Sequence, residues 1–353
     1  MLNKNMSISV AKLVSRLLQK LDARQRAVIE GRYGLKDGEP KTLAEIGDGM
    51  NVTRERVRQI EASALASLKP SLKEADVRAF IDTVKAHLKN VGGLRREDML
   101  LIDLKMMVAD GTIPQFGTKV HFLLDISGDT KYFPEDSANF GSWYLSEEDR
   151  KKAKAFIGKL MKAMESKRDT VVSHQNIDKV FGDALKPHDL KDLVALNYIS
   201  SSKHFHVNSY GDFGLTAWPE VNPKTVRDWA YLVLKKNGSP LHFGDIASTI
   251  NTVRKETKKA AHMQTVHNEL IKDNRFVLVG RGMYSLKEFG VMPGTAREVM
   301  ARLLTDHGPL SPDELLRLVL NERLLKKNTV LINLRNRKYF KRLDDGKYTV
   351  NFA

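Results

Sequence analysis

The sequence lacks several features that would point to common classes of protein. Its 353 residues include no cysteine, which excludes disulfides, thiolate zinc sites and cysteine nucleophiles and fits a reducing compartment. No apolar run approaches the roughly 20 residues of a membrane-spanning helix. The apolar residues from Val10 to Leu21 alternate with lysine and arginine, unlike the unbroken core of a signal peptide. We therefore expect a cytoplasmic protein without a membrane partner.

What the sequence has in excess is positive charge. Lysine and arginine number 58 against 43 acidic residues, which gives a formal net charge of +15 and a pI near 9.7. This excess predicts an anionic partner, most simply nucleic acid. An acidic membrane surface is the rival, but no basic amphipathic stretch carries a bulky aromatic face. The length predicts two to four domains, and a hydrophobic share of 42% is ordinary for a soluble globular protein.

Residues 42–69 have the layout of a helix-turn-helix. Thr42 and Glu45 form a capping box, so a helix should begin at Leu43. Glycine and asparagine are typical of turns. The residues that should interrupt this helix and supply the turn are Gly47, Gly49 and Asn51.

A second helix should follow, capped by Thr53 and free of glycine and proline to about Leu68. The residues at helical spacing that should face the core are Val57, Ile60, Ala64 and Leu68. On the opposite side, in the first two turns, lie Arg54, Glu55, Arg58 and Gln59. Arginine pairs with guanine, glutamine with adenine, and glutamate accepts from cytosine, and a recognition helix contacts bases with its N-terminal turns. The alternative is a solvated helix with a charged face.

Four short sequence blocks, in the same order as in a known family, favour DNA binding over a merely solvated helix. They read LDARQR, RYGL, TLAEIG and VTRERVRQIE and begin at residues 21, 32, 42 and 52. Residues 17–69 closely resemble region four of the bacterial sigma-70 factors. The resemblance implies base contacts by Arg54, Glu55 and Gln59, and positions at or near phosphates for Arg56 and Arg58. The expected DNA-binding residues of this module are therefore Thr42, Thr53, Arg54, Glu55, Arg56, Arg58 and Gln59.

The same resemblance implies a protein partner. Region four binds the upstream promoter hexamer and the flap of the polymerase β subunit. The apolar stripe from Val10 to Leu21 exceeds what one small helix-turn-helix needs, so Leu17 and Leu18 are the expected polymerase contacts. Met50 stands where the family usually has an aromatic residue, which should affect packing and not base reading. Nothing resembles the sigma regions that melt promoters, so this chain should not start transcription alone.

Beyond residue 72 the chain repeats one pattern. Residues 80–100, 229–246 and 299–315 each read as a helix, a glycine turn, a leucine and a second helix. Each is followed by a β-like stretch around a glycine, which is typical of a wing hairpin. A fourth such unit should place helices at residues 147–166 and 186–197. The expected fold is mainly α, a helix-turn-helix module followed by several small winged-helix (α+β) units, with boundaries at 1–72, 76–145, 147–219, 221–290 and 292–353.

Residues 221–290 also resemble a named family, the HARE helix-turn-helix domain, a winged helix found in the bacterial polymerase δ subunit. The matching blocks read LKKNG, PLHF, TVHNEL and RFVLVGRGMY. Members differ between DNA contact and polymerase contact. Basic residues before the expected recognition helix, residues 263–273, and on its wing are assigned to phosphate contact: Lys255, Lys258, Lys259 and Arg281. A second basic cluster crowds the C-terminal unit: Lys326, Lys327, Arg335, Arg337, Lys338, Lys341 and Arg342.

Patterns typical of catalysis or metal binding are weak. His204, His206 and Asp212 lack further ligands at suitable spacing. We expect no metal, no cofactor, no small-molecule substrate and no enzymatic activity. The main hypothesis is a nucleoid-associated, sequence-specific transcription factor that binds double-stranded DNA and the RNA polymerase core. The alternatives are a polymerase accessory factor of the δ-subunit type and a nucleoid-type DNA binder built from winged helices.

Overall fold

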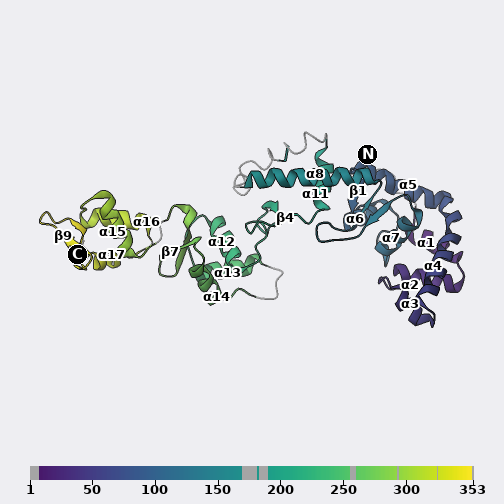
Figure 1. Ribbon diagram of the computed structural model, residues 1–353, viewed down its shortest axis with the longest axis horizontal. Helices are drawn as coiled ribbons and strands as arrows, with labels where there is room; N and C mark the ends of the chain where they lie inside the picture. Colours follow the sequence, from purple (N-terminus) through teal and green to yellow (C-terminus); the bar gives the residue numbers. More distant parts are fainter. Residues whose placement is uncertain are drawn as a thin grey trace. The chain divides into compact units, whose positions relative to one another are not determined.

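The computed structural model describes residues 8–168, 181–182, 190–254, 260–291, 294–323 and 325–351. The chain divides into two compact units, Met1–Phe205 and His206–Ala353. Figure 1 colours them by residue number. Among the described residues, no helix has both the length and the apolarity to span a bilayer.

The first unit begins with helices joined by short turns. They are α1 (Val10–Gln19), α2 (Ala23–Tyr33), α3 (Leu43–Met50), α4 (Arg54–Leu68), the short 3-10 helix η1 (Lys69–Lys73) and α5 (Ala75–Asn90). Each of the first four starts at a residue whose side chain accepts a backbone N–H of the first turn. Such caps satisfy donors that have no partner within the helix. The helix bounds therefore follow from local sequence.

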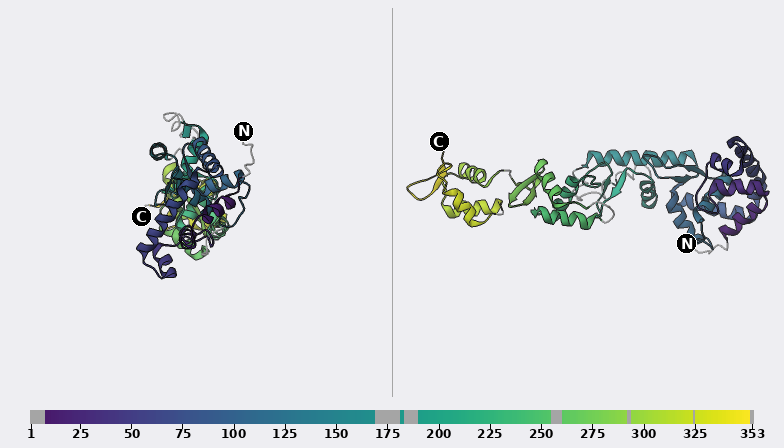
Figure 2. Two further views of the ribbon diagram at one scale, coloured as in Figure 1. Left: turned by 90° about the vertical axis from the view of Figure 1, so that its right-hand side faces the viewer. Right: turned by 90° about the horizontal axis from the view of Figure 1, so that it is seen from below.

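The rest of the first unit combines helices with a small sheet. Its elements are β1 (Leu94–Arg96), α6 (Glu97–Met107), α7 (Phe116–Ser127), β2 (Lys131–Phe133), β3 (Ser142–Tyr144), α8 (Glu147–Ser166) and α11 (Asp192–Ser200). The strands are antiparallel in the order β1-β3-β2, with Tyr144 opposite Leu94 on one side and Lys131 on the other. Figure 2 shows α8 as one long, straight helix. The helix expected at residues 147–166 is confirmed.

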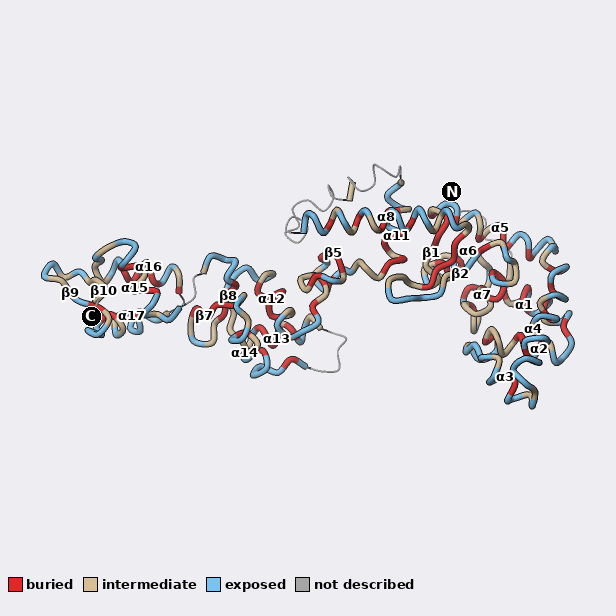
Figure 3. Tube along the Cα trace, viewed as in Figure 1, coloured by how far each residue is buried: buried red, intermediate tan, exposed pale blue. Residues whose placement is uncertain are grey.

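One hydrophobic core joins the N-terminal helices to the segment that follows them. Buried residues of α1, α5 and α7 belong to a single cluster, and Figure 3 colours buried stretches of the chain red. Its α1 members are Val10, Leu13, Val14 and Leu17. The expected boundary at residue 72 therefore does not separate two cores. Burial of each large apolar side chain contributes about 1.5–3 kcal/mol, so the two segments stabilise each other.

Polar contacts also cross this junction. The carboxylate of Asp110, which follows α6, accepts hydrogen bonds from the Ser9 hydroxyl at 2.7 Å and from the N–H groups of Val10 and Ala11 at 2.9 Å. The Tyr33 hydroxyl donates to Asp125 at 2.6 Å. The N-terminus of α1 is thus capped by a residue about a hundred positions further along the chain.

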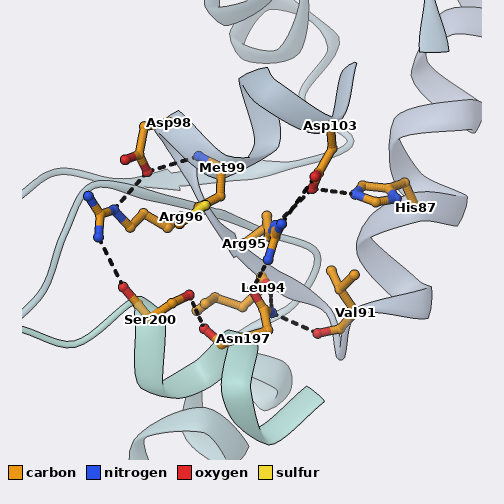
Figure 4. A network of polar contacts seen from close by, with 10 residues as sticks. All are labelled: His87, Val91, Leu94, Arg95, Arg96, Asp98, Met99, Asp103, Asn197 and Ser200. Atoms are coloured by element: carbon orange, nitrogen blue, oxygen red, sulfur yellow. Dashed lines mark hydrogen bonds and ion pairs between the residues drawn. The ribbon is translucent and has the colours of Figure 1, made fainter. Parts of the chain in front are cut away.

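A buried polar network ties α11 to β1 and α6 (Figure 4). The Asn197 amide is 2% exposed and donates to the carbonyls of Val91 and Leu94 at 2.7 and 2.5 Å. Arg95 donates to the Asn197 side-chain oxygen at 2.9 Å and to Asp103 at 2.9 Å. A buried amide without partners costs about 1–3 kcal/mol. The network therefore fixes where α11 packs. That helix begins at Asp192, later than the expected residue 186, and residues 183–189 lie outside the described part.

Two hydrophobic cores lie among the described residues of the second unit. Its elements are β4 (Phe205–Val207), where the division falls, β5 (Phe213–Leu215), α12 (Val226–Asn237), β6 (Leu241–His242), α13 (Phe243–Val253), α14 (Met263–Lys272), β7 (Phe276–Gly280), β8 (Met283–Leu286), η3 (Lys287–Phe289), α15 (Ala296–His307), α16 (Pro312–Glu322), α17 (Lys327–Leu334), β9 (Phe340–Arg342) and β10 (Tyr348–Val350). One core lies among α12, α13, α14 and the antiparallel sheet β6-β8-β7. The other lies among α15, α16, α17 and the β9–β10 hairpin.

Candidate nucleic-acid interface

Helix α3 is fixed at its start by a reciprocal cap. The Thr42 hydroxyl accepts the Glu45 N–H at 3.2 Å, and the Glu45 carboxylate accepts the Thr42 N–H at 2.7 Å. The hydrogen bond from the Thr42 backbone holds the pKa of Glu45 below its usual value. The expected capping box and the helix start at Leu43 are confirmed.

The turn after α3 differs from the sequence-based expectation. Gly47 and Gly49 do not interrupt the helix, which continues through both to Met50. Asn51 alone makes the turn, with φ of 54°, because its short polar side chain tolerates the left-handed conformation. Gly47 is needed for another reason. A Cβ there would lie 2.7 Å from the Val52 carbonyl oxygen, so glycine allows the close approach of the chain as it leaves the helix.

Helix α4 buries the side that the sequence predicted. The Thr53 hydroxyl accepts the Arg56 N–H at 3.2 Å and caps the helix. Val57 and Ile60 pack with Val28 and Ile46 in a small core against which Met50 also packs. Ala64 and Leu68 continue the buried side into the larger core. Met50 is thus a packing residue.

The opposite side of α4 presents a charged surface at its N-terminal turns. The expected contact residues of α4 and its cap are all exposed: Thr53, Arg54, Glu55, Arg56, Arg58 and Gln59. Arg58 forms a two-point contact with Glu55, at 2.7 and 2.9 Å. This pairing lowers the pKa of Glu55 and raises that of Arg58.

A second contact on this surface involves Gln59. Arg56 donates to the Gln59 side-chain oxygen at 3.1 Å, and a side-chain hydrogen bond from Gln59 helps to lower the pKa of Glu55. Arg54 makes no ion pair or hydrogen bond through its side chain within the described residues. The surface therefore combines one unpaired cation with two side-chain pairs whose hydrogen-bonding groups are partly pre-oriented.

Helix α4 is braced from behind by α2. Arg32 donates to Glu61 at 3.2 Å and to the Lys41 carbonyl at 3.0 Å. Gln25 donates to the Ser63 hydroxyl at 3.2 Å. A site on a braced helix loses little conformational entropy when it binds.

Comparison with known proteins agrees with this geometry. Residues 17–69 match the family model described as sigma-70, region 4. These residues form a sigma-70 region 4 domain. RNA polymerase sigma factor SigA of Nostoc sp. (strain PCC 7120) is 47% identical over 68 residues, which cover 19% of this chain and 17% of that protein. SigA1 of Synechococcus elongatus is 49% identical over 65 residues, 18% of this chain and 16% of that protein.

A plant relative matches over a stretch of similar length. RNA polymerase sigma factor sigB of Arabidopsis thaliana is 43% identical over 68 residues, 19% of this chain and 12% of that protein. The chain thus spans less than a fifth of the length of these curated relatives. The likeness covers the sigma-70 region 4 domain and not the chain as a whole.

The two residues expected to contact polymerase, Leu17 and Leu18, are buried or half-buried in the structure. Leu17 is 1% exposed and belongs to the core that α1 shares with α5 and α7. A partner protein therefore cannot reach it in this structure. Leu18 is half-buried against the same core. The apolar surplus of α1 is covered by later parts of the same chain, which the sequence of the first 72 residues could not reveal.

Of the residues between 221 and 290 that are expected to contact phosphate, the structure describes one, Arg281. Lys255, Lys258 and Lys259 lie outside the described residues. Arg281 is exposed in the turn between β7 and β8. Helix α14 agrees with the expected recognition helix to within one residue.

Of the histidine–aspartate group near β4, Asp212 has a structural role. Asp212 is 8% exposed. It accepts from Lys236 at 2.6 Å and from Asn208 at 2.9 Å. Asp212 therefore joins the β4–β5 hairpin to α12.

Proposed function

We propose that the sigma-70 region 4 domain binds double-stranded DNA and reads a promoter-like upstream element. Arg54, Glu55 and Gln59 are the base-reading residues in this proposal, and Arg56 and Arg58 contact phosphates. The observation that carries it is the exposed N-terminal surface of α4, held on a braced helix with its apolar side buried. Side chains of these types match the hydrogen-bonding groups of the major groove.

The free domain already holds part of this set in place. Glu55 is oriented by Arg58 and Gln59 by Arg56. Arg58 and Arg56 can keep these contacts while their remaining N–H groups face a phosphate, because a guanidinium carries five donors. Each phosphate-facing arginine would then also orient a base reader.

We further propose that the chain contacts RNA polymerase and acts in transcription regulation as a binding protein and not as an enzyme. The names of the relatives that match the domain support the polymerase link. Leu17 is not part of the proposed contact because it is buried. The chain would modulate initiation, or act beside a partner that melts the promoter.

The DNA proposal is tested with the full chain and a pool of random duplexes. Selection should return one preferred sequence. Arg54→Ala and Gln59→Ala should each lose about 1–3 kcal/mol of discrimination at one or two base pairs. Arg56→Ala should weaken binding to all duplexes and lower the salt slope by about one. Because Arg56 only orients Gln59, its loss of discrimination should be smaller than that of Gln59→Ala. Arg24→Ala, which removes an exposed arginine from α2, is the matched control and should keep the preference. Equal losses on chosen and random duplexes for Arg54→Ala and Gln59→Ala would refute base reading.

The polymerase proposal needs a separate measurement. Purified bacterial core RNA polymerase should be retained by the full, tagged chain without DNA. Leu17→Asp is unsuitable as a contact test, since it places a charge in a core and should unfold the unit. No retention in the full chain would leave a nucleoid-type DNA binder, the second candidate.

That second candidate rests on the second unit. A winged-helix unit of the HARE type is supported by the order of the elements from α12 to β8, which is helix, strand, helix, helix, strand, strand. The sheet order β6-β8-β7 also supports it. In this proposal Lys255, Lys258, Lys259 and Arg281 contact phosphates. A full chain with these residues changed to glutamine should bind random duplexes more weakly and keep its sequence preference. Unchanged binding would make this unit a protein-contact module.

A further inference from the structure

The C-terminal part of the second unit contains a basic groove of about 590 Å³. Its cations come from different backbone segments: Arg335 from the end of α17, Arg337 from the connection that follows, and Lys341 and Arg342 from β9. Among the described residues, the lining contains no carboxylate. We call these four residues and the space between them the C-terminal groove.

The charges of the C-terminal groove are not neutralised by the protein. All four cations are exposed, and none forms an ion pair within the described residues. Other arginines of this unit are paired, such as Arg275 with Asp273 at 2.7 Å. The carboxylates closest in sequence, Asp344 and Asp345, lie in the turn of the hairpin, where Asp345 accepts the Lys347 N–H at 3.0 Å. Four unpaired cations in one concave surface repel one another unless an anion binds.

The backbone that carries these cations is held firmly. The Asn351 side chain donates to the Arg337 carbonyl at 2.9 Å. Arg342 lies opposite Tyr348 in the β9–β10 pair, and Tyr348 in turn exchanges backbone hydrogen bonds with Leu310 at 2.8 and 3.2 Å. The groove is therefore built before any ligand arrives, which lowers the entropy lost on binding.

We propose that the C-terminal groove binds the phosphate backbone of double-stranded DNA. Arginine and lysine from separate segments suit successive phosphates of one strand. The one amide side chain of the lining, Asn351, already donates to the Arg337 carbonyl. Single-strand binders stack bases on exposed aromatic rings. Phe340 is 2% exposed and Tyr348 is half-buried, so the groove offers little stacking surface. A duplex fits its chemistry better than a single strand.

The groove deepens the proposed function without depending on base reading by α4. A backbone site tethered to a sequence reader raises overall affinity, commonly by about 10²–10⁴ where the geometry permits. It adds no preference of its own. The same duplex should be chosen with or without the groove, but held more tightly with it.

The test uses the full chain and compares two triple variants. Arg337→Gln/Lys341→Gln/Arg342→Gln removes three groove cations. Lys151→Gln/Lys152→Gln/Lys162→Gln removes three exposed lysines of α8 and changes the net charge equally. Binding to a labelled random duplex is followed by fluorescence anisotropy between about 50 and 200 mM salt.

The groove variant should lower the slope of log affinity against log salt by about 2.7, from three phosphate contacts at about 0.9 each. Between about 50 and 200 mM salt, the affinity of each protein for the duplex falls by some factor. This factor should be about 40-fold smaller for the groove variant than for the unmodified chain. The α8 variant should keep the original slope. Arg337→Lys/Arg342→Lys preserves both charges and should restore the slope, which separates charge from folding.

Several outcomes would overturn the proposal. Equal slopes for the groove variant and the unmodified chain would mean that the groove does not contact DNA. Equal decreases for both triple variants would mean that net charge alone matters. A loss seen only with a labelled single strand, or only with a duplex of RNA, would assign the groove to that ligand instead.

The groove proposal can be separated from base reading by α4. If Arg54→Ala shows no loss of sequence preference while the salt slope of the groove variant still falls, base reading fails and the groove proposal stands.

Discussion

The removal of the Asp110 carboxylate should destabilise helix α4 from a distance. Asp110 accepts hydrogen bonds from the Ser9 hydroxyl and the N–H groups of Val10 and Ala11 at 2.7–2.9 Å. Loss of an N-cap costs about 1 kcal/mol, and loss of a negative charge at a helix N-terminus adds about 0.3–1 kcal/mol. We expect Asp110→Ala to cost at most about 2 kcal/mol. The cost stays within this limit because Ser9 still caps the Lys12 N–H.

In a unit of this size, about 2 kcal/mol lowers the melting temperature by about 4–8 °C. Hydrogen exchange of the full chain locates the effect. Because α1 and α4 share one core with α5 and α7, amides of α4 should exchange faster together with those of α5 and α7. Asp48→Ala removes an exposed carboxylate of α3 that has no side-chain partner among the described residues and should change stability by less than about 0.5 kcal/mol. Faster exchange confined to residues 94–145 would refute the shared core.

The pH dependence of this stabilisation follows from the pKa of Asp110. Burial opposes its charge, but hydrogen bonds from Ala11, Ser9 and Val10 outweigh burial and lower the pKa. A carboxyl whose pKa is lower in the folded state stabilises the fold above its unfolded pKa of about 3.9, and the effect is lost as pH falls through the folded value. The stability difference between the unmodified chain and Asp110→Ala should be constant near neutral pH and shrink below about pH 4.

Two further changes test local features of the first unit. Gly47→Ala places a Cβ 2.7 Å from the Val52 carbonyl oxygen and should lower stability by about 1–3 kcal/mol. The control Gly49→Ala meets nothing within 4 Å and should raise stability by about 0.5–1 kcal/mol. Equal melting temperatures for the two variants would contradict this. Asn197→Ala leaves two buried carbonyls without their donor and should cost about 3 kcal/mol, while the control Asn90→Ala, at an exposed position, should leave the thermal melt nearly unchanged.

The sequence by itself determined the parts of the molecule that depend on neighbours along the chain. The caps at Thr42 and Thr53, the bounds of α4 and its buried side follow from contacts three or four residues apart. Such local interactions are encoded in short windows, so periodicity and capping rules read them correctly. The sigma-70 region 4 domain was recognisable for the same reason, since its motif lies within one continuous segment of 53 residues, 17–69.

Where local rules failed, a spatial contact that residue type alone does not specify decided the outcome. Gly47 and Gly49 read as a turn, yet both are helical, because the chain needs a close approach at Gly47 and a left-handed residue only at Asn51. Leu17 was interpreted as surplus apolar surface, yet it is buried in the core that α1 shares with α5 and α7. Neither a steric approach nor the identity of the covering helix is written in the residues next to these positions.

Tertiary structure also decided which polar groups act together. Asp110 caps α1 across a separation of 100 residues from Val10, and Asn197 joins α11 to carbonyls more than a hundred residues earlier. The basic cluster near the C-terminus was visible in sequence, but only the hairpin register and the Asn351 contact turn it into a groove. Hydrogen bonds and charges act over a few ångströms in space whatever their separation along the chain, so their partners become known only when the chain is folded.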